Sequence, residues 1–296
     1  MILPRWRWLW LALTATVLAA CSPEPEQRVA KPNPLLFEIA GPSGEVEGWM
    51  LGTIHALPKG TRWRNEQIDD AIDRADYLIV EIADLSDRTG IGNTFAELAT
   101  SPGQPALASR VAPGLEPALG KLIARGNYDP SDFDNTETWA AALILARTGD
   151  RGDAASGVDR AVISDFAGRE IREFEGAAQQ LAIFDTLPET DQRDLLEAVV
   201  VEMTDAKRSP RELSDAWLAG AEERLEEATS TGSMADKGLR YALLVRRNAA
   251  WAIKLARDLE AAPRPLVAVG AGHLVGPDSL VEKLRERGYT VTRLRR

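Results

Sequence analysis

Two short apolar runs, far apart in this chain of 296 residues, lead into the same Gly-x-x-His pattern. One is Trp49–His55 (WMLGTIH) and the other is Leu266–His273 (LVAVGAGH). A short run rich in aliphatic residues is typical of a strand buried on both faces, whose sheet needs helices on either side. Such runs alternate with helical patterns at both ends of the chain, whereas the middle is helical. We therefore expect an α/β fold: a central mixed β-sheet flanked by helices, with a helical insertion.

The patterns also place the individual elements. Strands are expected at residues 34–40, 45–55, 76–85, 170–175, 264–273 and 289–294. Helices are expected at residues 65–75, 134–147, 157–169, 176–187, 237–261 and 276–288, with weaker helical patterns at 93–125 and 189–228. Asn65 is expected to cap the first helix, and Asp134 with Glu137 has capping-box spacing.

The N-terminal residues have the features of a bacterial lipoprotein signal. Arg5 and Arg7 precede an apolar stretch, and Leu18-Ala19-Ala20-Cys21 follows it. The stretch Trp8–Ala20 falls short of the roughly 20 residues that a membrane-spanning helix needs. Cys21 is the single cysteine, and it lies where such a signal places the lipidated residue. A signal that is cleaved without lipidation remains the alternative.

These features divide the chain into three parts. Residues 1–20 are expected to be removed, residues 21–34 to form a lipidated, Pro-rich tether, and residues 35–296 to form one domain. The lipid on Cys21 would anchor the protein to the membrane of the cell envelope, facing the periplasm. Ser22, where an Asp would favour the inner membrane, favours the outer membrane instead.

The charge of the chain excludes one class of partner. The formal net charge is −10, and loss of Arg5 and Arg7 with the signal would make it −12. An acidic domain has no electrostatic basis for binding nucleic acid, so no nucleic-acid partner is expected.

The two histidines are the only ones in the chain, and both follow predicted strands. Ligand-binding and catalytic groups of α/β sheets gather where strands give way to loops, so His55 and His273 are expected to share a site. Gly52 and Gly270 would let the backbone turn tightly or let another group come close. A histidine after a strand is often only a hydrogen-bonded structural residue, and that remains the alternative for each.

Three acidic residues are candidate partners of the histidines. Glu81 interrupts an apolar strand, where a carboxylate is costly to bury unless it is paired or binds a metal. Glu175 ends the predicted strand 170–175, and Asp159 lies near the start of the helix after Gly157. The alternatives are that Asp159 only caps its helix and that Glu175 is solvated.

Arg247 and Asn248 lie in the middle of an apolar helix. A buried guanidinium should be paired, and Glu81 or Glu175 is the natural partner. Arg247 could be structural, could orient an acid, or could hold a substrate anion.

The candidate site suits two chemistries. Two histidines and one or two carboxylates suit a divalent metal such as Zn²⁺, Mn²⁺ or Co²⁺, which would activate a bound water. Without metal, a histidine could act as general base on water while Arg247 stabilises an oxyanion. The sequence contains no Gly-x-Ser-x-Gly, no glycine-rich phosphate loop and no Cys-x-x-Cys motif.

Several motifs, in order, resemble the TraB/GumN family, which includes the pheromone-shutdown proteins and the animal Tiki proteases. They are Met50–His55 with Leu57-Pro58, Glu81, Gly157–Asp159, Gln180–Pro188, Arg247-Asn248 and Val269–Gly276. One departure is Phe174–Gly176, where the family more often has Leu-Glu-Thr.

The resemblance implies a fold shared with Tiki and similar to erythromycin-esterase-like and ChaN-like proteins. It also implies a Mn²⁺- or Co²⁺-dependent peptidase site at His55, His273 and Glu81. The leading hypothesis is thus a lipid-anchored periplasmic metallohydrolase that acts on a peptide or a small amide or ester. Glu81 or Glu175 would be its base, with Arg247 and Asn248 in the site. The alternatives are a metal-free esterase-like hydrolase with a histidine base, and a non-enzymatic binding or scaffolding lipoprotein.

Overall fold

The computed structural model describes residues 31–149, 152–205, 211–260 and 263–295. The predicted signal and lipidated Cys21 lie outside these residues. Among the described helices, none is long and apolar enough to cross a membrane.

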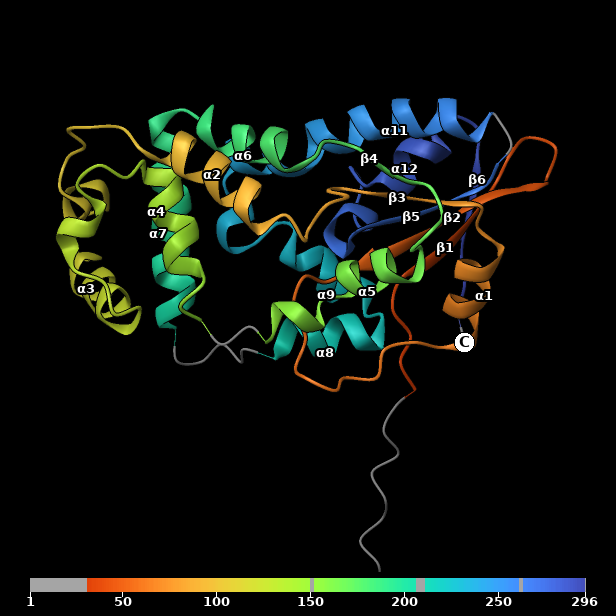
Figure 1. Ribbon diagram of the computed structural model, residues 1–296, viewed down its shortest axis with the longest axis horizontal. Helices are drawn as coiled ribbons and strands as arrows, with labels where there is room; N and C mark the ends of the chain where they lie inside the picture. The colour runs from red at the N-terminus through yellow and green to blue at the C-terminus, as the bar shows by residue number, and fades with distance from the viewer. Residues whose placement is uncertain (1–30, 150–151, 206–210, 261–262, 296) are drawn as a thin grey trace, which may run out of the picture. The chain divides into compact units, whose positions relative to one another are not determined.

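Six strands form one sheet in the order β4-β3-β5-β2-β1-β6 (Figure 1). Their bounds are β1 (Leu36–Ala40), β2 (Val46–Thr53), β3 (Tyr77–Val80), β4 (Ile171–Glu173), β5 (Pro265–Gly270) and β6 (Thr290–Arg293). Neighbouring strands from β4 to β2 run parallel, and β1 runs antiparallel to both β2 and β6. The predicted mixed sheet is confirmed.

The parallel pairing brings four strand ends to one edge of the sheet. Thr53 at the end of β2 pairs with Gly270 at the end of β5, and Val80 at the end of β3 pairs with Glu173 at the end of β4. Because carboxyl ends of parallel strands share an edge, the residues that follow these strands lie close together. One candidate residue follows each of these four strands: His55 follows β2, Glu81 follows β3, Glu175 follows β4 and His273 follows β5.

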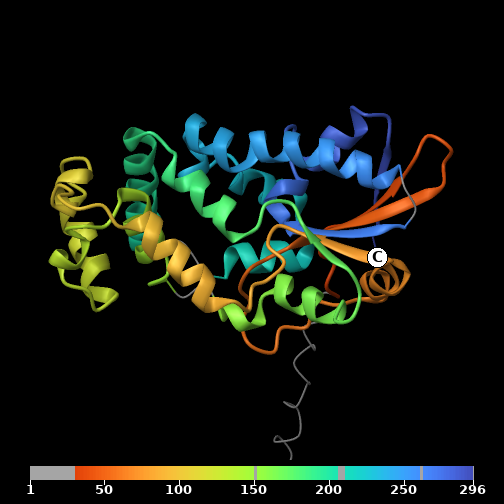
Figure 2. The same cartoon turned by 45° about the horizontal axis from the view of Figure 1, so that its top comes forward.

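Helices cover both faces of the sheet. Figures 1 and 2 show α11 (Arg246–Leu259) and α12 (Leu280–Arg285) on one face, and α1 (Glu66–Arg74) and α5 (Val158–Asp165) on the other. A buried apolar cluster joins these helices to the strands, as a parallel sheet requires.

A second buried apolar cluster forms among helices that leave the sheet at the ends of β3 and β4. The helices in this region are α2 (Arg88–Ala99), α3 (Glu116–Arg125), α4 (Thr138–Ala146), α6 (Ala177–Asp185) and α7 (Glu189–Thr204). Trp139 of α4 is fully buried within the cluster and lies against Phe95 and Phe184. This cluster is the predicted helical insertion.

The remaining helices connect the insertion to the sheet. They are α8 (Glu212–Ala219), α9 (Glu222–Ala228) and α10 (Lys237–Arg240), and a π-helical turn, Tyr241–Val245, joins α10 to α11. The single helix predicted at 237–261 is therefore interrupted by a wider turn.

Several predicted boundaries were wrong. The strand predicted to reach residue 273 ends at Gly270, and His273 lies in the 3₁₀ turn that follows (Ala271–Leu274). The helix predicted from residue 276 begins at Leu280. The third strand ends at Val80 rather than at residue 85, because the carbonyl of Glu81 turns to accept backbone N–H groups of Glu175 and Gly176. The helix α4 begins at Thr138, and Glu137, its N-cap, makes no side-chain capping bond. The capping box belongs to the preceding 3₁₀ turn (Pro130–Phe133), with Asp129 and Asp132 as its two members. The predicted cap of α1 is correct, since Asn65 accepts from the N–H of Ile68.

Candidate active site

Arg247 lies at the centre of a buried polar network beside the sheet edge. Its Nε is 3.0 Å from both carboxylate oxygens of Glu175, and its Nη2 donates to Glu81 Oε2 at 2.7 Å. Its Nη1 donates to His273 Nε2 at 3.1 Å and to the carbonyl of Leu243 at 3.0 Å. All three nitrogens are thus bound to acceptors, and the single guanidinium is the shared partner of two buried carboxylates.

The π-helical turn places Arg247 for these contacts. The turn widens the helix at Tyr241–Val245, directly before α11, and the carbonyl of Leu243 accepts one guanidinium bond. π-turns inside α-helices are rare and often lie at functional sites.

Both ring nitrogens of His273 are occupied. Nε2 accepts from Arg247, which has only donors, so the proton of the ring is on Nδ1, which donates to Asn248 Oδ1 at 2.6 Å. The amide of Asn248 is fixed in turn by its bond to the carbonyl of Asp278. Burial is the main cause that lowers the pKa of His273 to about 4, so the ring is neutral at pH 7.

Glu81 accepts hydrogen bonds from three donors. Besides Arg247, it accepts from the N–H of Gly270 at 2.8 Å and from Gln180 Nε2 at 2.9 Å, and it lies 3.9 Å from His273 Nε2. Burial alone would raise the pKa of Glu81, but His273, Arg247 and His55 together lower it to about 2. The carboxylate is therefore ionised throughout the neutral range.

Trp251 forms the apolar floor of the network. Its indole N–H donates to Glu175 Oε1 at 3.1 Å, and the guanidinium of Arg247 lies 4.5 Å from the centre of its ring. Its ring centre is 4.4 Å from that of His273 and 4.9 Å from that of Phe174. Trp251 therefore contacts Glu175, His273 and Arg247 together.

A second polar group lies at the end of β2. His55 Nδ1 is 2.9 Å from Asp159 Oδ2, and the hydroxyl of Thr53 donates to Asp159 Oδ1 at 2.5 Å. The side chain of His55 is 76% exposed, whereas that of Asp159 is 11% exposed. No described residue forms a hydrogen bond with His55 Nε2, so this nitrogen is open to solvent.

Asp159 changes the protonation of His55. The charge of Asp159, and then its hydrogen bond, raise the pKa of His55 to about 9. The pKa values of the two histidines are therefore shifted in opposite directions, although both residues follow the same sequence pattern.

Glycines let the parts of the site come close. A Cβ on Gly157 would lie 2.3 Å from the carbonyl oxygen of His55, and one on Gly270 would lie 3.3 Å from Glu81 Oε1. A Cβ on Gly52 would lie 3.1 Å from Leu35 Cβ and 3.2 Å from Ala271 Cα. None of the three has positive φ, so close approach is the reason for glycine here, rather than a tight turn.

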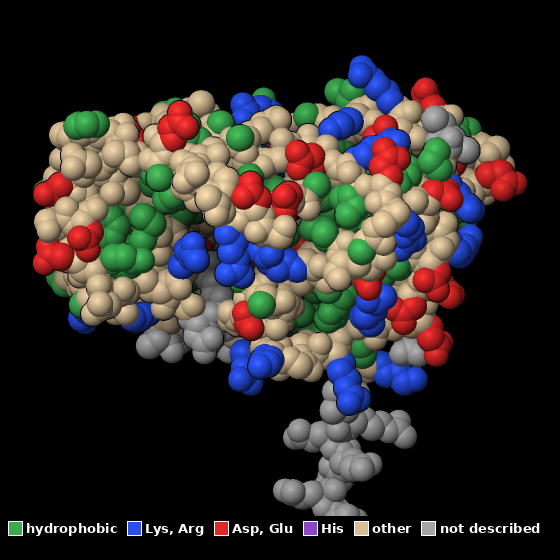
Figure 3. Space-filling model, in the orientation of Figure 1, with side chains coloured by type: hydrophobic (Ala, Val, Ile, Leu, Met, Phe, Trp, Pro, Cys, Tyr) green, Lys and Arg blue, Asp and Glu red, His purple; other side chains and the backbone are tan. Residues whose placement is uncertain are grey.

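The predicted residues thus form two groups. Glu81, Glu175, Arg247, Asn248 and His273 share the buried network, and His55 pairs with Asp159. No direct hydrogen bond joins the groups among the described residues, but His55 and His273 follow β2 and β5, which pair up to Thr53 and Gly270. The surface is not uniformly acidic: on the face in Figure 3, charges are mixed and Lys and Arg side chains gather beside a hollow.

The arrangement does not fit a metal bound by His55, His273 and Glu81. The nitrogen and oxygen that would bind it, His273 Nε2 and Glu81 Oε2, already accept from Arg247. In the described part of the chain, the group whose ligand atoms all lie within 4.8 Å of one another is instead Asp191, Asp194 and Asp236, in and after α7. A metal at the predicted ligands would have to displace a guanidinium from two partners.

Three residues of the site were not assigned a role from the sequence. They are Thr53, Gln180 and Trp251. Two of them could have been found from the sequence. Trp251 lies one helical turn after Arg247, on the same face of the helix, and Gln180 is the first residue of the family motif Gln180–Pro188. Glu175 was predicted to end its strand, but it lies two residues beyond β4, where it accepts from Arg247 and is followed by Gly176 with a φ of +81°.

Comparison with known proteins agrees with the sequence motifs. The sequence model of the TraB/PrgY/gumN family matches residues 35–293. No curated protein and no solved structure matches the chain significantly.

Proposed function

The chain belongs to the TraB/PrgY/gumN family, and on this premise we propose that it is a hydrolase of amide or ester bonds in which the His55–Asp159 pair transfers protons. The observation that carries the proposal is the contrast between the histidines. His273 has both nitrogens occupied, whereas His55 has a buried carboxylate on Nδ1 and an open Nε2. A histidine oriented by an acid, with its other nitrogen open, is the arrangement of a general base.

The reaction follows from these atoms. Neutral His55 takes a proton from water at Nε2 while the water oxygen attacks the carbonyl carbon of the substrate. Asp159 accepts the Nδ1–H bond and stabilises the imidazolium that forms. The bond from carbon to the leaving nitrogen or oxygen then breaks, and His55 returns the proton to the leaving group.

In this proposal Arg247 positions the other residues of the buried network and does not contact the substrate. Nε bonds to Glu175, Nη1 to His273 and a backbone carbonyl, and Nη2 to Glu81 and, at 2.9 Å, to Glu175. All five N–H groups therefore have acceptors, which leaves none for a substrate oxygen. The network keeps the edge of the sheet rigid and places the negative charge of Glu81 near His55, where it favours the imidazolium.

A metal-dependent hydrolase is the second candidate. His55 Nε2 is open to a divalent metal, but a metal that also bound His273 and Glu81 would have to displace Arg247 from both. Metal analysis of protein purified without a His tag, beside a variant with both histidines replaced by alanine, separates the candidates. Stoichiometric metal in the natural protein and none in the variant would favour this candidate over the metal-free one.

The lipoprotein features of residues 1–21 support a location on the periplasmic side of the envelope, anchored through Cys21. The substrate would then be a peptide or another amide or ester of that compartment.

Activity should be sought with the full chain in detergent, because no smaller part has been shown to fold alone. A complex peptide mixture is incubated with the natural protein, with His55→Gln and with Glu45→Gln, an exposed control, and the products are identified by mass spectrometry. Cleavage by the natural and control proteins, reduced at least a hundredfold in His55→Gln, supports the proposal. Equal cleavage by all three would refute it, and binding without turnover would favour a binding lipoprotein.

A further inference from the structure

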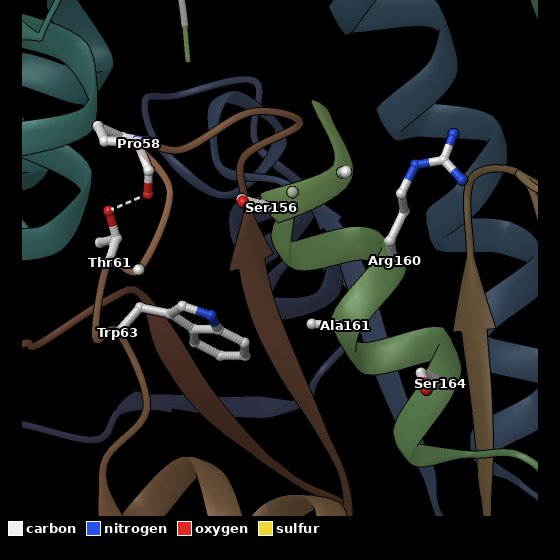
Figure 4. A pocket seen from close by; sticks show the side chains of 10 residues that line it. Pro58, Thr61, Trp63, Ser156, Arg160, Ala161 and Ser164 are labelled. Atoms are coloured by element: carbon white, nitrogen blue, oxygen red, sulfur yellow. Dashed lines mark hydrogen bonds between the residues drawn. The ribbon is translucent and has the colours of Figure 1, made fainter. Parts of the chain in front are cut away.

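A pocket of about 370 Å³ lies between the loop that follows His55 and the start of α5 (Figure 4). One wall is the loop after His55, with Pro58, Thr61 and Trp63. The other wall is the start of α5 and the turn before it, with Ser156, Ala161 and Ser164. The volume falls in the usual range for a small-molecule site.

The backbone connects this pocket directly to the proposed base. The segment from Ile54 to Leu57 pairs with the segment from Asp153 to Val158, through N–H bonds from Val158 to Ile54 and from Asp153 to Leu57. His55 lies in the first segment, and its partner Asp159 directly follows the second. The pocket walls are the continuations of these two paired segments, so the pocket and the His55–Asp159 pair are built from the same two stretches of chain.

The walls select an uncharged group. Figure 4 shows the indole of Trp63 on one side and the small side chains of α5 on the other, with Arg160 directed away from Trp63. Arg160 is the one charged residue of the lining, and it donates to the carbonyl of Leu85 outside the pocket. Pro58, Ala161 and the part of Trp63 that is left exposed (7%) after its packing on Trp217 supply apolar contact area, and an aromatic ring beside an indole gains stacking energy.

The opening also has hydroxyl groups. Thr61 donates its hydroxyl hydrogen to the carbonyl of Pro58 at 2.6 Å, so its oxygen remains an acceptor. The hydroxyls of Ser156 and Ser164 have no hydrogen-bond partner among the described residues, so they can meet a polar edge of the ligand. An amide backbone next to an apolar side chain has this combination of properties.

We propose that this pocket is the substrate subsite for a large uncharged side chain, aromatic in preference, on the residue next to the bond that is cut. The inference rests on the proposed hydrolase for its link to cleavage, whereas binding in the pocket does not depend on it.

The test uses N-acetyl-phenylalaninamide as a probe, with N-acetyl-glycinamide and N-acetyl-lysinamide for comparison. Binding to the full chain in detergent is followed by the NMR signal of the Trp63 indole N–H, identified by its loss in Trp63→Phe. The phenylalanine probe should shift this signal in the natural protein and in His55→Ala, and the other two probes should bind at least tenfold more weakly.

Ala161→Leu fills the pocket and should weaken binding of the phenylalanine probe at least tenfold. Ala167→Leu, at an exposed position after the same helix, is the matched control and should bind as the natural protein does. If Ala161→Leu unfolds, Ser164→Leu, at an exposed position, gives the same test. Equal binding of all three probes, or unchanged binding in both filled variants, would overturn the subsite.

The outcomes separate the two proposals. Probe binding with no turnover of any substrate contradicts the hydrolase but supports the pocket. Turnover in which Ala161→Leu keeps the preference of the natural protein supports the hydrolase and overturns the pocket.

Discussion

The same four-residue pattern leads to opposite environments for its two histidines. Because His55 is open and paired with Asp159, and His273 is enclosed by Arg247, Asn248 and Trp251, their titrations should be widely separated. With only two histidines in the chain, NMR of the imidazole nitrogens can follow each one separately. We expect one ring to titrate near pH 9 and the other near pH 4 in metal-free protein.

The titration of His55 also has a consequence for stability. Its pKa is higher in the folded protein than in the unfolded chain, so the pairing with Asp159 stabilises the fold fully below about pH 6.5 and is lost as pH rises through about 9. In His55→Gln this part of the pH dependence should be missing from chemical denaturation curves. The same curve for both proteins between pH 6 and 10 would contradict the pairing.

Arg247 should be indispensable to the fold. Arg247→Met leaves Glu81 and Glu175 buried without a cation, which costs about 3–5 kcal/mol when one partner of a buried ion pair is removed. The matched control is Arg224→Met, which removes an exposed ion pair with Glu212 and should cost at most about 1 kcal/mol. Denaturant unfolding of both variants measures the difference, and equal losses would contradict a buried network.

At the scale of elements, the strand ends and the segment before α5 decide whether the site forms. Gly157→Ala places a methyl group 2.3 Å from the carbonyl oxygen of His55, so the segment must move away from β2. We expect a loss of about 1–3 kcal/mol in the free energy of unfolding and a fall in the pKa of His55, since Asp159 moves with the segment.

Gly92→Ala is the control for this substitution. Gly92 lies in α2 with open space around it, so an added methyl group should stabilise the helix by up to about 1 kcal/mol. If Gly157→Ala were equally stabilising and left the pKa of His55 unchanged, the close approach would not matter.

Much of the fold was predictable from the sequence because local patterns decide it. Buried aliphatic runs specify β3 and β5, and the Asn65 cap specifies the start of α1. The end of β3 at Val80 and the start of α4 at Thr138 were not predictable, because contacts with Glu175, Gly176 and Gln192 from distant segments decide them.

The sequence predicted which residues form the site, but not which hydrogen bonds and ion pairs join them. The sequence singled out His55, Glu81, Asp159, Glu175, Arg247 and His273 by strand ends and by buried charge. It offered no way to see that Arg247 would occupy Glu81 and His273 together, because that depends on how α11 packs on the sheet. From the sequence Trp251 looked like an ordinary core residue. The residues that its indole contacts, Phe174, Glu175 and His273, are distant in the sequence, and only the fold brings them to it.

At the scale of the whole molecule, the fold brings residues from the start, middle and end of the chain to one sheet edge. The proposed anchor lies outside this domain. We expect mass spectrometry of the mature protein to show an N-terminal peptide that begins at Cys21 and carries diacylglycerol and an acyl chain. In Cys21→Ala these lipid masses should be missing, whereas Ser22→Ala should keep them. An N-terminal peptide with unmodified Cys21 would argue against the anchor.

The central claim is that His55, tuned by Asp159, transfers the protons of a hydrolytic reaction. The most direct test is kcat/KM against pH for the natural protein and for Asp159→Asn, with a substrate found in the peptide screen. The natural protein should gain about tenfold per pH unit up to a limit near pH 9, where His55 becomes neutral. Asp159→Asn removes the main cause of the raised pKa, so its profile should reach a lower limit at a more acidic pH. A variant profile that is lower at every pH but keeps the same midpoint would contradict the account.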